Sequence, residues 1–312
     1  MYFPYVRGRQ YELLALKDLI GKDLICDKVI PVIEPVKLTS TLINTISEYV
    51  KADRRVGVVL NPGVGNFLSE CKKAQPKSKE KTWCDDFESH CNSSSIIPSL
   101  IMNLGTSDSL QGRSSSDFLI IHNDSDFLDD YERLFGAAAP KYTLIPDERA
   151  FRRNVVAGKV LFEDKFAKKM RNADYEKKPD EPFSDEHLFF ADEGYLGFSD
   201  YSVIGADYAE TGFAPYAVAI HIVYFDEHKK LRIRHFVSNS NDDIEDPAGK
   251  FYEALIKLNK WYQSEANPPC TAGINAFLEH YKKQTYPGLG TVKKLALMHH
   301  LELVSQFFEE RA

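Results

Sequence analysis

Short apolar runs in the first half of the chain give way, one after another, to a polar or acidic residue. The runs are Val29–Val32, Val56–Leu60, Ile96–Met102, Phe118–Ile121, Tyr142–Ile145 and Val160–Phe162. The polar residues that come after them are Glu34, Asn61, Asn103, His122, Asp147 and Glu163. Two facing carboxylates can divide the roles of general acid and general base, and a histidine beside them can move a proton or bind a metal. These positions are the first candidates for chemistry.

Glu34, Glu163 and His122 are the candidate catalytic residues. Both glutamates end apolar runs, which places their carboxylates beside the apolar interior. His122 opens the sequence His122-Asn123-Asp124-Ser125-Asp126, which is dense in potential ligands but lacks the spacing of a calcium hand. The same sequence is typical of a strand end followed by a helix cap, in which Ser125 would be the cap.

Five further residues are candidates for binding a substrate at the same rim. They are Asn61, Asn103, Asp124, Asp200 and Arg9. Arg9 and the nearby Arg7 precede a predicted helix, and arginine binds a carboxylate or another anion with two parallel hydrogen bonds. Any one of these residues could instead be an ordinary loop residue, because loops are polar and lie at the surface.

The sequence leaves the question of a metal open. A rim rich in carboxylate and amide oxygens could hold Mg²⁺ or Mn²⁺. A second candidate is the group Cys84, His90 and Cys91, with Cys71 upstream. This group contains no C-x-x-C pair, and an irregular insertion that happens to carry cysteines explains it better.

The elements that would position these residues alternate between strand and helix. Arg9–Gly21 and Ser40–Lys51 carry apolar residues at helical spacing, and predicted strands lie between such helices. This order is typical of a parallel α/β sheet, in which functional residues gather at the carboxyl ends of the strands. We therefore predict a distorted (β/α)8 TIM-like barrel, with a doubly wound open sheet as the alternative.

The second half of the chain adds other elements to this predicted barrel. Ala217–Phe225 and Leu231–Val237 predict an antiparallel hairpin, and residues 249–312 predict a helical C-terminal extension. Tyr201–Ile204 predicts a further strand, and the charged, proline-containing stretch Asp174–Pro182 predicts a loop. We expect residues 1–312 to form one α/β domain with a mobile insertion near residues 71–81.

Composition limits the classes of protein to consider. The 312 residues are 43% hydrophobic and 27% charged, as in an ordinary globular protein, and the formal net charge is -7. An acidic chain is a poor general coat for nucleic acid, although binding a nucleic acid or nucleotide at a local groove stays open. No apolar stretch is long enough to cross a membrane, the N-terminus lacks a signal pattern, and the odd count of five cysteines suits reduced thiols. We expect a cytoplasmic protein.

Two parts of the sequence resemble the "beta family" of bacterial and phage-associated proteins. The first is Tyr2–Leu13 together with Ile30–Pro35, and the second is Gly212–Ile222 together with Gly288–Leu295, which is similar to one bacterial branch. The resemblance covers nearly the whole chain. It implies a role in anti-phage defence beside a co-encoded partner protein, because the family is associated with mobile elements and phage-defence neighbourhoods. It assigns no catalytic residue.

Two hypotheses of function follow. The first is an anti-phage hydrolase, metal-assisted or carboxylate-based, that acts on a nucleotide, a nucleic acid or another phosphorylated or glycosidic substrate. The second is a non-catalytic barrel that binds and regulates a co-encoded partner.

Overall fold

The computed structural model describes residues 1–110, 113–209 and 215–311. The chain divides into two compact units. The first consists of Met1–Asp164 and Glu186–Tyr201, and the second of Lys165–Asp185 and Ser202–Ala312. The chain thus leaves the first unit, returns to it and leaves it again. The expected organisation as a single domain stays a prediction.

The first unit is built on eight parallel strands. They are β1 (Tyr5–Val6), β2 (Val32–Ile33), β3 (Val56–Val59), β4 (Ile96–Ile101), β5 (Leu119–Ile121), β6 (Tyr142–Ile145), β7 (Lys159–Phe162) and β9 (Gly197–Ser199). Their order in the sheet is their order in the chain. Tyr2 bridges to both Val29 and Phe198, and the Tyr5 amide donates to the Asp200 carbonyl at 2.8 Å. The last strand therefore meets the first, and the sheet forms the predicted (β/α)8 TIM-like barrel.

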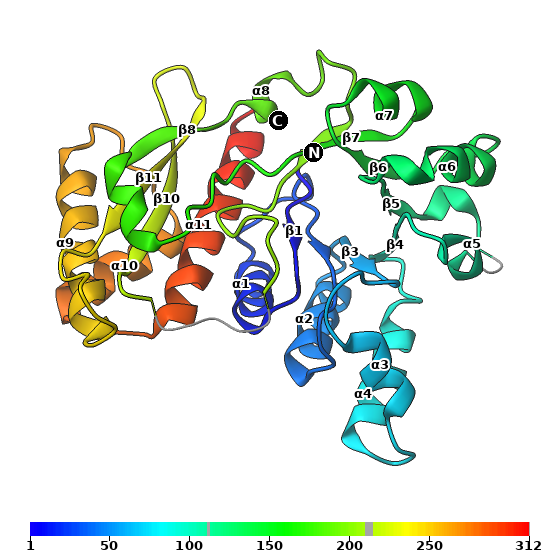
Figure 1. The fold of residues 1–312 in the computed structure, drawn as a ribbon, viewed down its shortest axis with the longest axis horizontal. Coiled ribbons are helices and arrows are strands. Elements are labelled where there is room, and N and C mark those ends of the chain that lie inside the picture. The colour runs from blue at the N-terminus through cyan, green and yellow to red at the C-terminus, as the bar shows by residue number, and fades with distance from the viewer. Residues whose placement is uncertain (111–112, 210–214, 312) are drawn as a thin grey trace. The chain divides into compact units, whose positions relative to one another are not determined.

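Helices alternate with the barrel strands and lie outside them (Figure 1). They are α1 (Gln10–Gly21), α2 (Ser40–Lys51), α3 (Phe67–Lys73), α4 (Lys79–His90), α5 (Thr106–Ser109), α6 (Leu128–Phe135), α7 (Arg149–Asn154) and α8 (Glu186–Phe189), with short 3-10 turns η1 (Ser115–Asp117) and η2 (Ser125–Phe127). The Thr39 hydroxyl caps α2 by accepting from the Leu42 amide at 3.2 Å.

Strand alternation decides which side chains fill the barrel. Successive residues of a strand point to opposite faces, so residues two apart share the interior. Tyr5 and Val32 are partners in the ladder and both are buried. In β7, Phe162 pairs with Ser199 of β9. The ring of Phe162 lies 5.4 Å from the ring of Tyr5. These contacts fix the interior face of each strand end, which the site below depends on.

Three details of the barrel differ from the sequence analysis. The strand β1 was not expected, because two residues after Pro4 give no periodic signal. Tyr201–Ile204 is not a strand; the preceding Gly197–Ser199 pairs with β7 instead. The stretch near residues 71–81, expected as a mobile insertion, contains the end of α3 and the beginning of α4, which the Ser78 hydroxyl caps. Its mobility stays a prediction.

The second unit is an antiparallel sheet with helices on it. Its strands β8 (Asp180–Ser184), β10 (Ala219–Phe225) and β11 (Leu231–Val237) lie in the order β10-β11-β8. The helices are α9 (Pro247–Ser264), α10 (Ala272–Lys283) and α11 (Leu289–Glu310), with a 3-10 helix η3 (Asn172–Lys177). Trp261 of α9 packs against Tyr224 and Phe236, whereas Phe307 of α11 packs against Phe225 on the opposite face.

The expected hairpin and C-terminal helices are present, but the expected loop Asp174–Pro182 is not. It contains η3 and the beginning of the edge strand β8, in which Pro182 is exposed. Proline is tolerated on an edge strand because its missing N–H is not needed by a neighbour. Thr291 lies inside α11, whose N-cap is Gly288, and Ser125 is not a side-chain cap either, since the Asp124 carboxylate caps η2.

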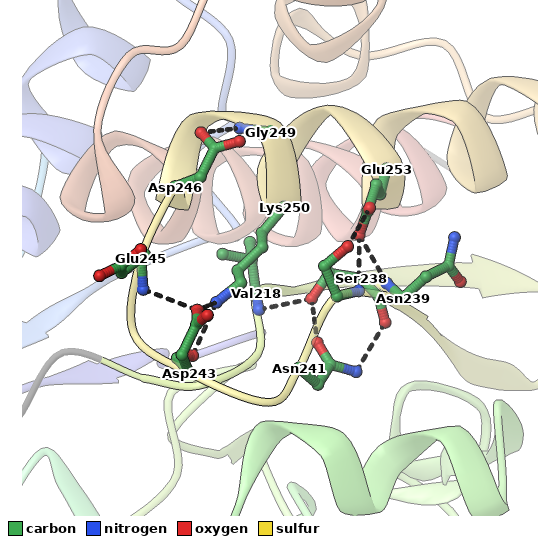
Figure 2. Close-up of polar contacts among 11 residues, drawn as sticks. Val218, Ser238, Asn239, Asn241, Asp243, Glu245, Asp246, Gly249, Lys250 and Glu253 are labelled. Carbon is green, nitrogen blue, oxygen red and sulfur yellow. Dashed lines mark hydrogen bonds and ion pairs between the residues drawn. The ribbon is translucent and has the colours of Figure 1, made fainter.

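A polar loop joins β11 to α9 in the second unit (Figure 2). The Glu253 carboxylate accepts from the Asn239 amide at 2.7 Å and from the Ser240 amide at 3.0 Å. The Lys250 ammonium, only 3% exposed, donates to the Asp243 carbonyl at 2.7 Å and to its carboxylate at 3.0 Å. Side chains of the helix therefore hold the loop from both ends.

Candidate functional site

The candidate site lies at the carboxyl end of the barrel strands, on the interior face. Side chains that follow β1, β2, β7 and β9 with the interior parity converge there. They are Arg7, Glu34, Asp164 and Tyr201, above the last interior residues Tyr5 and Phe162. All belong to the first compact unit. In barrels of this kind, polar groups at this end are the ones that bind and react.

Glu34 is the buried centre of this group. The residue is 2% exposed, and its carboxylate accepts two hydrogen bonds and forms one ion pair. The Tyr5 hydroxyl donates to Oε2 at 2.8 Å, the Gly63 amide donates to Oε1 at 2.8 Å, and Nε of Arg7 lies 3.4 Å from Oε2. Both carboxylate oxygens are thus occupied by donors, as a buried carboxylate requires. Glu34 is held in one orientation and in turn holds its three partners.

Two features of the backbone bring those partners to Glu34. Gly8 follows Arg7 with φ +55°, and a Cβ there would come within 2.9 Å of the Glu34 carbonyl. The loop Asn61–Asn66 brings the Gly63 amide to Oε1, and it turns at Gly65 with φ +78°. Glycine adopts such φ values most readily, and a Cβ at Gly65 would come within 2.7 Å of the Val36 Cα. The close approach of these two segments to the residues after β2 therefore requires glycine at both positions.

Arg7 carries the positive charge of the site. Its side chain is 16% exposed, and its guanidinium carbon lies 5.6 Å from the centre of the Tyr201 ring. A guanidinium held between a carboxylate and a ring is oriented before any ligand arrives. Arg7 is therefore a cationic group at the mouth that is held by Glu34 and Tyr201 and still reaches solvent.

Three aromatic rings form a floor under these charges. Tyr5, Phe162 and Tyr201 have ring centres 5.0–5.4 Å apart in pairs and are each no more than 9% exposed. Burial, followed by the Glu34 charge, raises the pKa of Tyr5 well above its usual value of 10. Burial also raises the pKa of Tyr201, against the opposing effect of Arg7. Both phenols therefore keep their protons at neutral pH, and Tyr5 donates its proton to Glu34.

Asp164 supplies an exposed carboxylate at the same place. It follows Phe162 by two residues, so strand parity carries it to the interior side of β7. Its charge contributes to the raised pKa of Tyr201, which places it near that ring. The mouth thus has one buried carboxylate, that of Glu34, and one exposed carboxylate, that of Asp164.

His122 does not join this group. It is fully buried, and its ring stacks on Tyr131 at 4.8 Å and meets Phe151 edge-on at 4.8 Å. These two rings come from α6 and α7, which lie outside the barrel (Figure 1). Burial lowers the pKa of His122 to about 4, against the opposing charge of Asp124, so the ring is neutral at pH 7. Neither ring nitrogen has a hydrogen-bond partner among the residues that the structure describes.

Glu163 and Asp200 also take the outward parity. Glu163 is half-buried and accepts the Asp147 amide at 2.9 Å. Asp200 is 2% exposed and accepts the Tyr2 hydroxyl at 2.7 Å, and burial together with Asp200 raises the pKa of Tyr2 well above 10. Both carboxylates fasten neighbouring segments of the barrel wall. The structure therefore does not bring Glu163 together with Glu34.

The two asparagines bond to backbone. Asn61 donates from Nδ2 to the Ile101 carbonyl and accepts the Ile101 amide at Oδ1, both at 2.8 Å. Its side chain extends the ladder between β3 and β4. Asn103 accepts the Gly105 amide at 2.9 Å and so closes a turn after β4.

The remaining predicted substrate-binding residues lie at helix beginnings. Asp124 is exposed and accepts the Asp126 amide at 3.0 Å, which caps η2. Arg9 is the N-cap of α1, and its amide donates to the Glu12 carboxylate at 3.5 Å. Both contacts stabilise local backbone. Of the catalytic and binding residues predicted from the sequence, Glu34 is the one that belongs to the interior group at the mouth.

The donor atoms at the mouth do not form a metal site of the expected kind. Within residues 1–110, 113–209 and 215–311 there is no group of three or more histidine, cysteine, aspartate and glutamate side chains placed to hold a metal ion. The cysteine cluster behaves as apolar packing in α3 and α4: Cys84 and Cys91 are buried, and burial raises the pKa of Cys91 to about 12. The question of Mg²⁺ or Mn²⁺, which the sequence leaves open, gains no candidate donor set from the described residues.

Comparisons with known proteins leave the family open. No family model matches the chain, and searches of curated proteins and of solved structures found no match. In the part of the chain that the structure describes, no helix is both long and apolar enough to cross a membrane. Of the residues that carry the resemblance to the beta family, 212–214 lie outside the described part. An argument about function therefore rests on the barrel and on the residues at its mouth.

Proposed function

We propose that the protein is a hydrolase whose substrate binds at the barrel mouth, over Arg7, Tyr201 and Asp164. The observation that supports it best is the ion pair between the buried Glu34 and the partly exposed Arg7. Placing an ion pair in a barrel interior costs desolvation free energy that apolar residues would avoid. A cation that is fixed by a buried carboxylate and still reaches solvent is the kind of group that recognises a ligand.

Charge favours a hydroxyl-rich, glycosidic substrate among the classes considered. The interior group at the mouth contains one guanidinium and two carboxylates, so its formal charge is negative. A polyphosphate or a nucleic acid would be repelled by such a balance, because it needs cations in excess. Sugars instead place hydroxyls on carboxylates and arginine, and their flat apolar faces suit the ring of Tyr201.

The proposed roles follow from access. Asp164 is the exposed carboxylate and acts as the proton-transferring group or nucleophile on the glycosidic bond. Arg7 hydrogen-bonds to substrate hydroxyls. Glu34 is a positioning residue, because its oxygens are engaged by Tyr5, Gly63 and Arg7 and the residue is 2% exposed.

A set of chromogenic nitrophenyl glycosides, with nitrophenyl phosphate included, tests this proposal. We expect the wild-type protein to release nitrophenol from a glycoside and the D164N variant to lose that activity. The D192N variant is the matched control, since Asp192 is an exposed carboxylate of the same unit away from the strand ends. Release from the phosphate alone, or a D164N variant as active as the control, would contradict the proposal.

A second candidate function is the non-catalytic barrel that binds and regulates a co-encoded partner. The aromatic floor favours it, because Tyr5, Phe162 and Tyr201 close the top of the barrel interior. It predicts that D164N and R7K leave the biological activity unchanged. The role in anti-phage defence that the resemblance implies belongs to both candidates, and plaque counts on cells that express each variant measure it.

A further inference from the structure

A line of three polar side chains crosses the sheet of the second compact unit. His221 of β10 and His235 of β11 are direct partners in the antiparallel ladder, so both point to the same face. Their Nδ1 atoms lie 2.8 Å apart. On the other side, Nε2 of His235 lies 3.2 Å from Oε1 of Glu181 in β8. Each strand of the sheet contributes one group to this Glu181–His235–His221 line.

The geometry determines which nitrogen carries each proton. A carboxylate only accepts hydrogen bonds, so Nε2 of His235 must donate to Glu181. In the neutral His235 ring, Nδ1 is then the acceptor, and it must receive the proton of His221 Nδ1. His221 is thereby left with a proton on Nδ1 and a lone pair on Nε2. The line ends in a basic nitrogen.

Burial differs along the line. Glu181 is 6% and His235 is 4% exposed, whereas His221 is half-buried. The ring of Tyr175 lies 4.6 Å and that of Phe166 lies 5.1 Å from the ring of His221, both edge to face. The same two rings also lie beside His235, at 4.6 Å for Tyr175 and 6.5 Å for Phe166. Of the three groups in the line, His221 is thus the one that is not fully buried.

Burial lowers the pKa of both rings and so favours their neutral forms at pH 7. Burial lowers the pKa of His235, with Glu181 opposing it, and burial, then His235 and Lys293, lower that of His221. Lys169 and Asp180 act on His235 with opposite signs. Burial opposes ionisation of Glu181, but its hydrogen bonds to Lys178 and His235 prevail and lower its pKa. These directions agree with the tautomers that the hydrogen bonds require.

We propose that Glu181, His235 and His221 form a proton relay, in which His221 Nε2 accepts a proton from a hydroxyl group or water of a ligand bound against Tyr175 and Phe166. When the ligand O–H transfers its proton to Nε2, the Nδ1 proton of His221 moves to His235 Nδ1. His235 then holds two protons beside the Glu181 carboxylate. The relay gains one proton and loses none, and Glu181 balances the charge.

In many hydrolases a carboxylate orients one imidazole, and that imidazole contacts the reacting group directly. Here a second imidazole, that of His221, stands between the carboxylate-bound His235 and the reacting group. This arrangement lies in the second unit and includes none of the residues at the barrel mouth. The relay therefore goes beyond the proposed hydrolase, and its test needs no glycoside and no barrel activity.

The tautomers are measurable in the intact protein. Histidine-selective ¹⁵N labelling and long-range ¹H–¹⁵N spectra at pH 7.5 distinguish a protonated ring nitrogen from a bare one. We expect His221 to carry its proton on Nδ1 and His235 on Nε2. A His221 ring that is protonated on Nε2 at this pH would overturn the proposal.

Accessibility and activation are tested with diethyl pyrocarbonate, which reacts with a bare imidazole nitrogen. Mass spectrometry gives the reaction rate of each histidine, and the exposed His228 serves as an internal reference. We expect His221 to react while His235 stays protected. In E181Q the rate at His221 should fall at least several-fold, whereas the control E176Q, which changes an exposed glutamate paired with Lys257, should leave it unchanged.

Two outcomes of this experiment contradict the relay. One is a wild-type protein in which His221 is as protected as His235, since the network would then be structural only. The other is an E181Q variant that reacts at the wild-type rate. If E181Q fails to fold, the wild-type spectra and the wild-type labelling pattern still decide the question.

Discussion

Nε of Arg7 lies 3.4 Å from Oε2 of Glu34, inside the mouth of the barrel and one strand apart. The same carboxylate accepts the Tyr5 hydroxyl and the Gly63 amide. The side chain of Glu34 is buried, and that of Arg7 reaches solvent. Through these contacts the pair connects the first two strands, the loop after β3 and the ring of Tyr201.

Removing one member of the pair should cost more than removing both. In E34L the guanidinium and the two other donors lose their acceptor, and breaking a buried pair costs about 3–5 kcal/mol. In the double variant R7L/E34L no buried charge is left without a partner. We expect the double variant to be less destabilised than the sum of the single variants, as measured by urea unfolding. Strict additivity of the three free energies would show that the pair is not coupled.

The loop after β3 should depend on glycine at position 65. In G65A the new Cβ would come within 2.7 Å of the Val36 Cα, at a φ of +78°. We expect a loss of more than about 2 kcal/mol, since steric overlap adds to the cost of the left-handed backbone. G194A is the matched control: its φ is +80°, but nothing lies within 4 Å of the added Cβ. It should lose only about 1–2 kcal/mol, and equal losses would contradict this account.

His122 should make the barrel sensitive to acid. Its pKa is lowered to about 4 in the folded chain, against about 6.5 unfolded. The unfolded chain therefore binds more protons between these values, and stability should fall as the pH falls from 6.5 to 4. The loss is on the order of 3 kcal/mol at most for this group. His299, whose pKa burial also lowers to about 4, adds a loss in the same window.

The variant H122F isolates the contribution of this histidine. Phenylalanine keeps the contacts with Tyr131 and Phe151 and removes two buried nitrogens without partners in the described chain. We expect H122F to be more stable than the wild type at pH 7 by about 1–3 kcal/mol and by more at pH 5. Urea unfolding at both values checks this, with H228Q as an exposed control. A less stable H122F at pH 5 would show that the imidazole is bonded in solution.

Lys250 should anchor the loop that joins β11 to α9. In K250M the methionine fills the buried stem, but the hydrogen bonds to the Asp243 carbonyl and carboxylate are lost. We expect a destabilisation of about 1–3 kcal/mol. D243N should cost less than K250M, because the Asp243 side chain is 62% exposed and the contact of Lys250 with the carbonyl remains. If D243N lowered the free energy of unfolding in urea more than K250M did, Lys250 would not be the residue that anchors the loop.

The barrel could be predicted from the sequence because its strands are continuous apolar runs between helical periods. The candidate site could be predicted only in part. Glu34 was predicted because it ends an apolar run, and it faces the interior because it follows Val32, an interior residue, by two positions. Glu163 and His122 come directly after their runs, and with the opposite parity they face outward. The first polar residue after a strand is thus not a sufficient criterion, since its parity must also match the interior residues of the strand.

The parity requirement is also met by the other members of the interior group. Arg7 follows Tyr5, Asp164 follows Phe162 and Tyr201 follows Ser199, each by two positions. Applying this requirement needs the interior face of each strand, which pairing across the closed sheet decides. The strand β1 has only two residues, so its parity is visible only in the ladder with β2. The relay likewise depends on register, since His221 and His235 are fourteen residues apart in the chain.

The most direct test of the barrel-mouth assignment is a crystal structure of the D164N variant soaked with a nitrophenyl glycoside that the wild type cleaves. The account predicts a sugar ring over Tyr201 with a hydroxyl in hydrogen-bond distance of Arg7, and an unchanged contact of Arg7 with Glu34. A sugar bound at any other place on the chain, or a wild-type protein that cleaves none of the glycosides, would contradict it.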